Sequence, residues 1–255
     1  MGIEGHPALR ESSAVDLARL AERVQPVALA HERTLSVLPA LESLLPDGLR
    51  RGSVVAVTGT AATSLALAVT AGPSGAGSWS VAVGVPALGL VAAGELGVAL
   101  ERLAVVGPPP PDAWAPVVAT LVEAFDVVLV RPPRTVRRAD ARRLTARARE
   151  RGTVVLQLGA TDALEGDLHL HTEMREWCGL GDGHGHLRAR RVRVHAEGRR
   201  RATRPRRVDL WLADGQGRVS LAGDRDAVPG PRTVDGGRDD RVDGAGRAGY
   251  VTSVA

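Results

Sequence analysis

The sequence predicts an α/β protein whose central sheet is mostly parallel, is flanked by helices, and ends in antiparallel strands at its C-terminal end. Short apolar runs without polar alternation recur between segments of helical periodicity, which is typical of parallel strands covered on both faces. Later segments alternate apolar and polar residues, as half-exposed antiparallel strands do. The chain has 255 residues, a length that suits one sizeable α/β core with additional ends.

Capping and turn signals place the elements in order. Ser12 or Ser13 can cap a helix over 13–24. A second short helix is expected over 35–45, and Pro46-Asp47-Gly48 then breaks the chain before the first strand. The expected parallel strands are 53–57, 78–83, 103–106, 126–130 and 153–158, the helices between them are 64–71, 88–100, 112–124 and 137–151, and the antiparallel strands are 167–171, 187–195 and 208–212.

Composition divides the chain into an N-terminal helical segment (1–34), the α/β domain (35–221) and a tail (222–255). Gly, Asp, Arg and Pro dominate the tail, which is therefore expected to be disordered. Cys178 is the single cysteine, which excludes an internal disulfide and fits a reducing compartment. The sequence shows neither a signal peptide nor a membrane span. We therefore expect a cytoplasmic protein without membrane contacts, with association with the nucleoid as an alternative.

The segment 53–69, SVVAVTGTAATSLALAV, has the outline of a phosphate-binding loop: β-branched residues, a glycine, a small polar turn and an apolar helix. On the pattern G-x-x-x-x-G-K-[ST], Gly59 fills the first position. Ser64, Leu65 and Ala66 stand where the second glycine, the lysine and the magnesium-binding hydroxyl belong. A shift of register cannot supply the lysine, because all 33 Lys and Arg residues of the chain are arginines.

Two stretches resemble the RecA core. The segment 44–57, LLPDGLRRGSVVAV, resembles the entry to that core, where an apolar helix and a GLPRG-like turn lead into the first strand. Leu96-Gly97-Val98 followed by 103–106 resembles the RecA stretch in which a helix ends at LGV before the next strand. The resemblance covers 38–212 and implies a RecA-like fold. The stretch 175–194, REWCGLGDGHGHLRARRVRV, is most similar to actinobacterial ImuA-type accessory proteins of mutagenesis cassettes.

This resemblance implies a function and partners. ImuA-type proteins keep the RecA-like scaffold without its nucleotide site and serve DNA damage tolerance, that is, translesion synthesis and induced SOS mutagenesis. The implied partners are an ImuB-type homologue of Y-family polymerases and an error-prone polymerase of the replicative α-subunit type, with single-stranded DNA as a further candidate. Two alternatives stay open: a SulA-type inhibitor of cell division, and a RecA-like DNA-binding ATPase that retains nucleotide binding.

Two other positions lack the carboxylates that ATP hydrolysis needs. The strand FDVVLV ends in Arg131, where a P-loop enzyme has an aspartate that holds the magnesium-bound water. The glutamate of RecA-like ATPases would fall on or near Val85, in a region without acidic residues. Gln157 stands where RecA-type proteins carry a nucleotide-sensing glutamine, and we interpret it as a polar residue that closes a strand. We therefore expect no ATP hydrolysis, no catalytic residue and no cofactor.

Histidines and the cysteine gather in the distal third of the chain. They do not follow the spacing of a zinc site, since there is one cysteine and His184-Gly185-His186 belongs to a glycine-rich turn. His169 and His171 would share one face of a strand, facing solvent as readily as a ligand. We expect no metal site.

Arginines form two clusters, which suit phosphate contacts, an acidic protein partner or a solvated surface. Neither cluster has the interleaved aromatic residues on which single-stranded bases usually stack. The first cluster comprises Arg131, Arg134, Arg137, Arg138, Arg142, Arg143, Arg147, Arg149 and Arg151. The second, our candidate surface for DNA or a partner, comprises Arg188, Arg190, Arg191, Arg193, Arg199, Arg200, Arg201, Arg204, Arg206 and Arg207.

Overall fold

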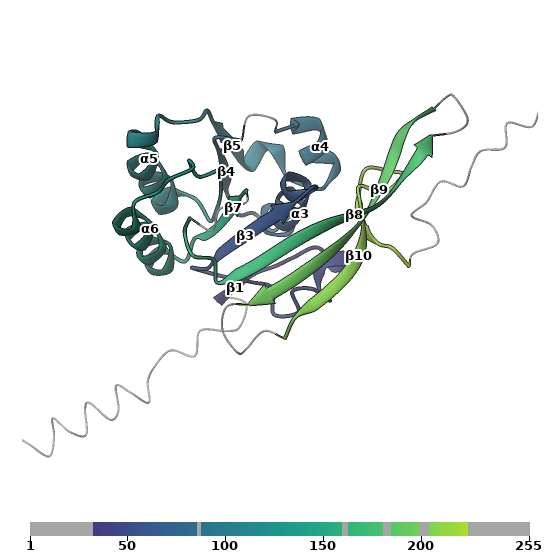
Figure 1. Ribbon diagram of the computed structural model, residues 1–255, viewed down its shortest axis with the longest axis horizontal. Coiled ribbons are helices and arrows are strands. Elements are labelled where there is room, and N and C mark those ends of the chain that lie inside the picture. Colours follow the sequence, from purple (N-terminus) through teal and green to yellow (C-terminus); the bar gives the residue numbers. More distant parts are fainter. Residues whose placement is uncertain (1–32, 86–87, 160–162, 181–184, 199–203, 224–255) are drawn as a thin grey trace, which may run out of the picture.

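The computed structural model describes residues 33–85, 88–159, 163–180, 185–198 and 204–223. They form a nine-stranded mixed sheet flanked by helices, with a separate two-stranded sheet (Figure 1). The strands are β1 (Thr34–Leu35), β2 (Leu49–Arg50), β3 (Val54–Gly59), β4 (Ser80–Val83), β5 (Leu103–Val106), β6 (Val127–Val130), β7 (Val154–Leu158), β8 (Leu168–Leu180), β9 (Gly185–Gly198), β10 (Arg206–Leu212) and β11 (Val219–Leu221). The helices are α3 (Ala62–Gly75), α4 (Leu90–Glu95), α5 (Pro111–Ala124) and α6 (Arg138–Arg151), with single 3-10 turns η1 (Pro39–Leu41) and η2 (Leu100–Arg102).

The large sheet has the strand order β11-β10-β9-β8-β3-β7-β6-β4-β5. All neighbours from β8 through β3 to β5 are parallel, and those from β8 to β11 are antiparallel. The predicted α/β fold, mostly parallel with an antiparallel C-terminal extension, is confirmed. The segment 167–171 was only half right as an antiparallel strand, because β8 also pairs in parallel with β3. Alternation of apolar and polar residues indicates that one face of a strand is exposed, but it does not indicate whether the neighbouring strand is parallel or antiparallel.

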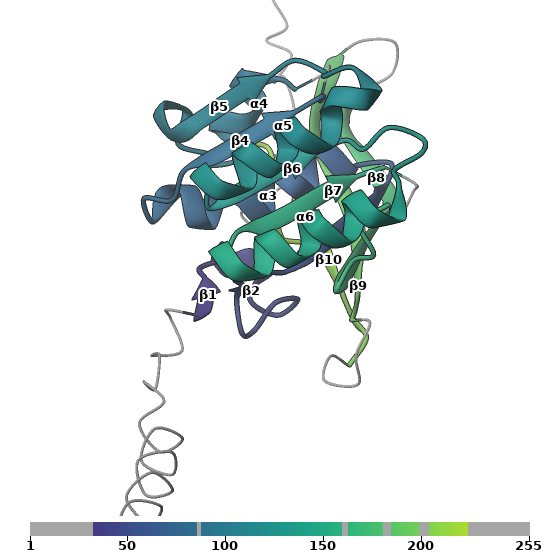
Figure 2. The ribbon, with the colours of Figure 1, turned by 90° about the vertical axis from the view of Figure 1, so that its left-hand side faces the viewer.

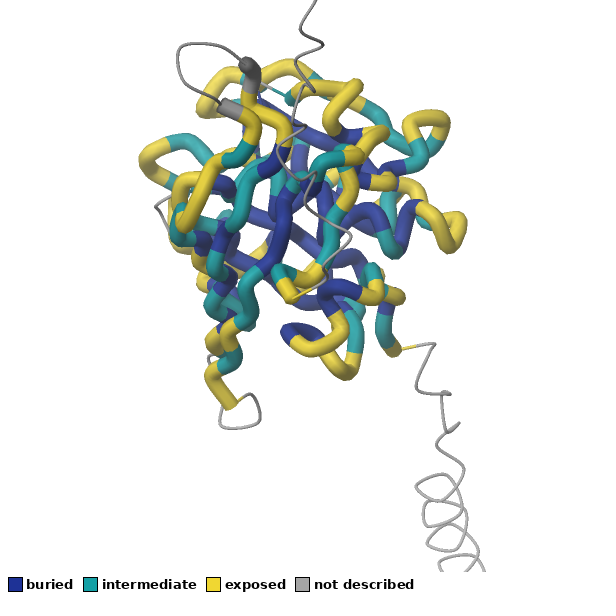
Figure 3. Tube along the Cα trace, turned by 90° about the vertical axis from the view of Figure 1, so that its right-hand side faces the viewer, coloured by how far each residue is buried: buried dark blue, intermediate teal, exposed yellow. Residues whose placement is uncertain are grey.

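The sheet separates two hydrophobic cores. Successive β3 residues point to opposite sides, so Val54 belongs to one core and Val55 to the other. Helices α5 and α6 cover the first core, whereas α3 and α4 cover the second (Figure 2). The buried residues gather along the strands in the middle of the molecule (Figure 3). This arrangement explains why the parallel strands read as continuous apolar runs.

The helix expected over 35–45 is wrong. Leu35 pairs with Leu49 in the β1–β2 ladder, and the chain then makes only the η1 turn. Leu41, Leu44 and Leu45 are buried at helical spacing, but they pack on the core from a turn that Pro39 begins. Burial in an irregular segment can therefore imitate the periodicity of a helix.

Helix α4 is shorter than the predicted 88–100. It ends at Glu95, and Gly97 follows with φ of +99°. The amide of Val98 donates to the carbonyl of Ala93, and that of Gly97 to Gly94, both at 3.0 Å. This closing turn separates α4 from η2.

Other expectations fall beyond the described residues. The helix over 13–24 and residues 224–255 of the tail lie outside the part of the chain that the structure describes. Within the described part, no helix combines the length and apolar character needed to cross a membrane.

Candidate functional site: the turn between β3 and α3

A short turn joins β3 to α3. Gly59 ends β3 with φ of +96°, and a Cβ there would approach within 2.8 Å of the Thr172 amide nitrogen on β8. The Thr172 hydroxyl accepts a hydrogen bond from the Ala61 amide (3.0 Å) and donates one to the Thr58 carbonyl (3.1 Å). Helix α3 begins at Ala62, so two residues separate the strand from the helix. A phosphate-binding loop needs more chain than this to wrap a phosphate with its amides.

The residues at the lysine and hydroxyl positions of the motif belong to the core. Leu65 and Ala66 have no exposed surface and pack in the core under α3. The Leu65 amide donates to the Ala61 carbonyl at 2.9 Å, so Leu65 lies in the first turn of the helix. Ser64 faces the other way and lines a cavity. The first helical turn therefore presents a hydroxyl to the cavity and an aliphatic side chain to the core.

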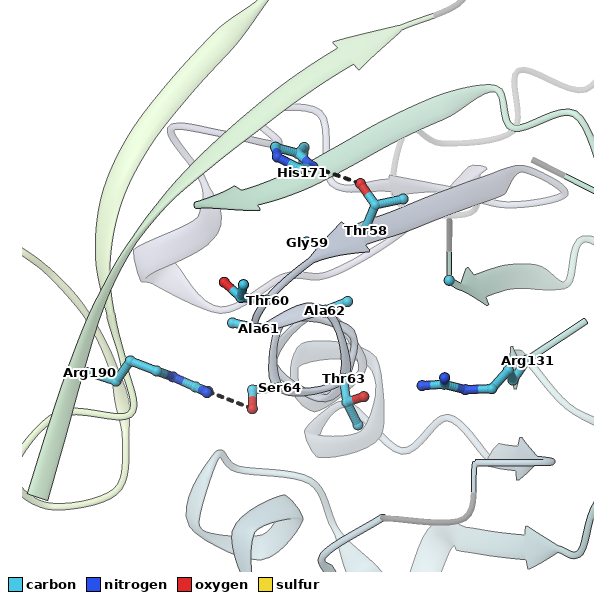
Figure 4. Close-up of a pocket in the computed structure, with 11 residues that line it drawn as sticks. Thr58, Gly59, Thr60, Ala61, Ala62, Thr63, Ser64, Arg131, His171 and Arg190 are labelled. Carbon is cyan, nitrogen blue, oxygen red and sulfur yellow. Dashed lines mark hydrogen bonds between the residues drawn. The ribbon is translucent and has the colours of Figure 1, made fainter. Parts of the chain in front are cut away.

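The cavity above this turn has a volume of about 730 Å³ (Figure 4). It lies at the carboxyl ends of β3, β6 and β7, the end of a parallel sheet at which α/β proteins bind ligands. None of the eleven described residues that line it is acidic. Its polar lining consists of the hydroxyls of Thr58, Thr60, Thr63 and Ser64, the His171 ring, and the guanidinium groups of Arg131 and Arg190.

Arg190 reaches the cavity from β9. Its Nη2 donates to the Ser64 hydroxyl at 2.6 Å and its Nε to the Leu212 carbonyl at 2.7 Å. The guanidinium also lies 5.2 Å from the centre of the Trp177 ring, a cation–π distance. Burial lowers the pKa of Arg190, but a guanidinium stays charged near neutral pH. Arg190 therefore brings a fixed positive charge to the first turn of α3.

Arg131 reaches the cavity from the opposite side (Figure 4). It follows β6, where its amide donates to the Val83 carbonyl at 3.2 Å. Its exposed guanidinium makes no hydrogen bond or ion pair with any described residue. Arginine side chains and hydroxyls bind the oxygens of anions, whereas a magnesium ion prefers carboxylates. The donors here suit an anion and differ from those of a P-loop site.

Gln157 is fully buried near the end of β7. Its Oε1 accepts a hydrogen bond from the Leu164 amide at 3.0 Å. This contact holds the chain that follows β7, as expected of a polar residue that closes a strand. Val85, near the expected glutamate position, is buried in the core.

The members of the second arginine cluster lie in different surroundings. Arg199, Arg200 and Arg201 lie outside the described residues, and Arg190 lines the cavity. The exposed members are Arg188, Arg204 and Arg207, and Arg206 is half-buried.

Arg191 and Arg193 of this cluster meet a carboxylate. Arg193 binds both oxygens of Asp209, with Nε–Oδ1 at 2.6 Å and Nη2–Oδ2 at 3.0 Å, and Arg191 adds a contact at 3.2 Å. Arg191 also lies 3.7 Å from Glu176. These hydrogen bonds, that of Arg193 first, lower the pKa of Asp209. Much of the positive charge on this face of β9 is therefore neutralised within the protein.

Replacing Asp209 with asparagine should lower the free energy of unfolding at neutral pH by about 1 kcal/mol, since bidentate but solvent-accessible pairs contribute modestly. The pKa of Asp209 is lowered in the folded state, so its contribution is complete above the ordinary value of 3.8 and disappears as the pH falls through the lower folded-state pKa. Urea unfolding at a series of pH values measures both effects. Asp47→Asn, at an exposed position, is the matched control. An equal loss of unfolding free energy in both variants would show that the Arg193–Asp209 pair does not stabilise the fold.

Sequence reasoning identified Gly59, Leu65 and Arg131 but did not place His171, Thr172 or Arg190 at this site. His171 was considered only as a metal or ligand contact and Arg190 only as a contact to DNA or a protein partner. Both come from strands more than 100 residues along the chain. His171 lies on β8, which pairs with β3, and Arg190 lies on β9, which pairs with β8. Among the described residues, no three His, Cys, Asp or Glu side chains cluster as metal ligands, and His184 lies outside the described part.

The sheet order and its flanking helices form an α/β fold of the RecA-like type. The crystal structure of the RadB recombinase has the same fold, with a TM-score of 0.54 and 15% sequence identity, and the match covers 72% of this chain and 96% of that one. Residues 43–163 match the family model of the MT3502 N-terminal domain. The uncharacterized protein Rv3395c of Mycobacterium tuberculosis is 38% identical over 147 residues, which are 57% of this chain and 67% of that protein. The chain belongs to the family of Rv3395c.

Proposed function

We propose that the protein is a non-catalytic RecA-like accessory protein of DNA damage tolerance. The observation that carries the non-catalytic part of this proposal is the turn between β3 and α3, which leaves two residues for the loop and puts Leu65 and Ala66 in the core. The role in DNA damage tolerance rests on the ImuA-type resemblance. The absence of carboxylates among the described residues that line the cavity supports it. A scaffold of this kind would act through what it binds, independently of nucleotide hydrolysis.

The proposed partners are an ImuB-type homologue of Y-family polymerases and an error-prone polymerase α subunit, on the ImuA-type resemblance of 175–194. Of this stretch, residues 175–180 belong to β8 and residues 185–194 to β9, and these two strands pair with each other. β3 pairs with β8 only as far as Thr172, and β10 pairs with β9 only from Arg191 onwards. The far ends of these two paired strands therefore extend past their neighbours (Figure 1), with Trp177 47% exposed. Such a ribbon offers a large surface to a partner.

Mg-ATP should change neither the assembly nor DNA binding of this protein. The expected result is co-purification of the protein with the two polymerase-type partners, to the same extent with and without Mg-ATP, and no ATP hydrolysis above background. A RecA-type recombinase assayed in parallel is the positive control for hydrolysis. ATP-dependent binding or filament formation would contradict the proposal. Capture of a tubulin-like division protein without either polymerase would instead support the SulA-type alternative.

A further inference from the structure

A second cavity, of about 1020 Å³, runs beside α6. It lies between one face of the helix, the chain that leads into the helix from β6, and residues 163–167 before β8. Figure 2 shows α6 on the outer side of the sheet, next to β7. No residue that lines this cavity also lines the one above the turn between β3 and α3. The cavity therefore does not belong to the site described above. We call it the α6 groove.

Three arginines that line the α6 groove have no partner among the described residues. Arg134, Arg138 and Arg142 are exposed and make no hydrogen bond or ion pair with any described residue. Three other arginines of α6 differ, because Arg147 pairs with Glu123 at 3.2 Å, Arg149 with Asp167 at 3.2 Å and, more loosely, Arg143 with Asp140 at 3.9 Å. The positive charge of the first three is thus available to an external ligand, in contrast to that of Arg191 and Arg193 on β9.

The spacing of these arginines produces a row. Arg138 and Arg142 are one helical turn apart, about 6 Å along the axis, and Arg149 lies about 10 Å further on at the same face. Arg134 continues the row beyond the start of the helix. A regular row of guanidinium groups along a groove is suited to a ligand with regularly repeated negative charges.

The side chains that line the groove determine which part of such a ligand they could contact. Among the described residues that line it, the apolar ones are aliphatic, such as Val136, Ala141 and Leu164, and none is aromatic. Two carboxylates, Glu165 and Asp167, line it as well, and Asp167 is engaged by Arg149. Bases therefore find no ring to stack upon, and guanidinium contacts to phosphates are the main interaction that the groove offers. Contacts of this kind do not depend on base sequence.

We propose that the α6 groove binds the phosphate backbone of single-stranded DNA through Arg134, Arg138 and Arg142. This extends the proposed function by naming a DNA surface, and it places that surface on the first arginine cluster instead of the second. A single strand is flexible enough to follow the groove between α6 and 163–167, so that its phosphates meet all three arginines.

The test uses the full chain and fluorescein-labelled oligothymidylate, with binding followed by anisotropy between about 50 and 200 mM salt. The triple variant Arg134→Gln, Arg138→Gln, Arg142→Gln should bind more weakly, and the slope of log K against log salt should become shallower by about 2, at roughly 0.7 per phosphate contact. The matched control is Arg137→Gln, Arg143→Gln, Arg151→Gln. It removes the same charge from exposed positions on or next to α6 outside the groove, and its slope should stay near that of the unchanged protein.

Equal slopes in the two triple variants, or no binding by the unchanged protein at low salt, would overturn the proposal. So would displacement of the DNA by polyglutamate at equal charge concentration, which would indicate an acidic protein as the occupant. Arg142→Gln alone, with an expected slope change of about 0.7, keeps the test decisive if the triple variant does not fold. Polymerase capture is measured separately, so loss of DNA binding with capture intact would reject this inference and leave the proposed function standing.

Discussion

Leu65→Lys is expected to unfold much of the protein without restoring nucleotide binding. Leu65 has no exposed surface and packs in the core under α3, so the substitution would bury an amine in an apolar environment. Loss of the leucine contacts and the depressed pKa of a buried lysine together cost roughly 5 kcal/mol. This is comparable to the whole free energy of unfolding of many domains. Urea unfolding followed by circular dichroism measures the loss, and titration with Mg-ATP tests binding.

Leu65→Met is the control for this experiment. It keeps the apolar character and approximate volume of the side chain, so its cost should stay below about 1.5 kcal/mol. A Leu65→Lys protein that is as stable as the methionine variant and binds Mg-ATP would show that the loop can rearrange into a phosphate site. That outcome would contradict both the inert loop and the proposed non-catalytic function.

Gly59→Ala should produce the second largest effect. The φ of +96° at Gly59 is unfavourable for an L-residue, and a Cβ would meet the Thr172 backbone, which can move only by separating β3 from β8. We expect a loss of about 3 kcal/mol, which for a domain of this size lowers the melting temperature by roughly 10 °C. Differential scanning calorimetry measures the shift.

Gly75→Ala provides the matched control at the other end of α3. A Cβ at Gly75 would meet no atom within 4 Å, and alanine favours helical backbone over glycine. Its melting temperature should be unchanged or slightly higher. Similar losses in the two variants would show that the tight passage between Gly59 and Thr172 is not what stabilises this turn.

The altered loop could be recognised from local sequence because each feature depends on neighbouring residues. The apolar run before Gly59 predicts a strand, and Leu65 and Ala66 continue an apolar helix whose inner face must be buried. The strand that ends in Arg131 could be placed in the same way. Periodicity failed over 35–45, where buried leucines belong to a turn and a short strand. Periodicity also could not predict that β8 lies next to β3 in the sheet.

The sequence by itself determined the α/β class, the parallel core strands, and the missing lysine, since these follow from composition, local periodicity and motif spacing. Only the tertiary structure decided which distant side chains meet. The β3–β8–β9 pairing brings Thr172 and Arg190 to the turn after Gly59, and the β9–β10 register neutralises Arg191 and Arg193 with Asp209. The arginines of 134–151 look alike in sequence, but Arg134, Arg138 and Arg142 make no ion pair with any described residue, whereas Arg147 and Arg149 contact Glu123 and Asp167. Charge pairing of this kind depends on distances in space, which one-dimensional spacing does not contain.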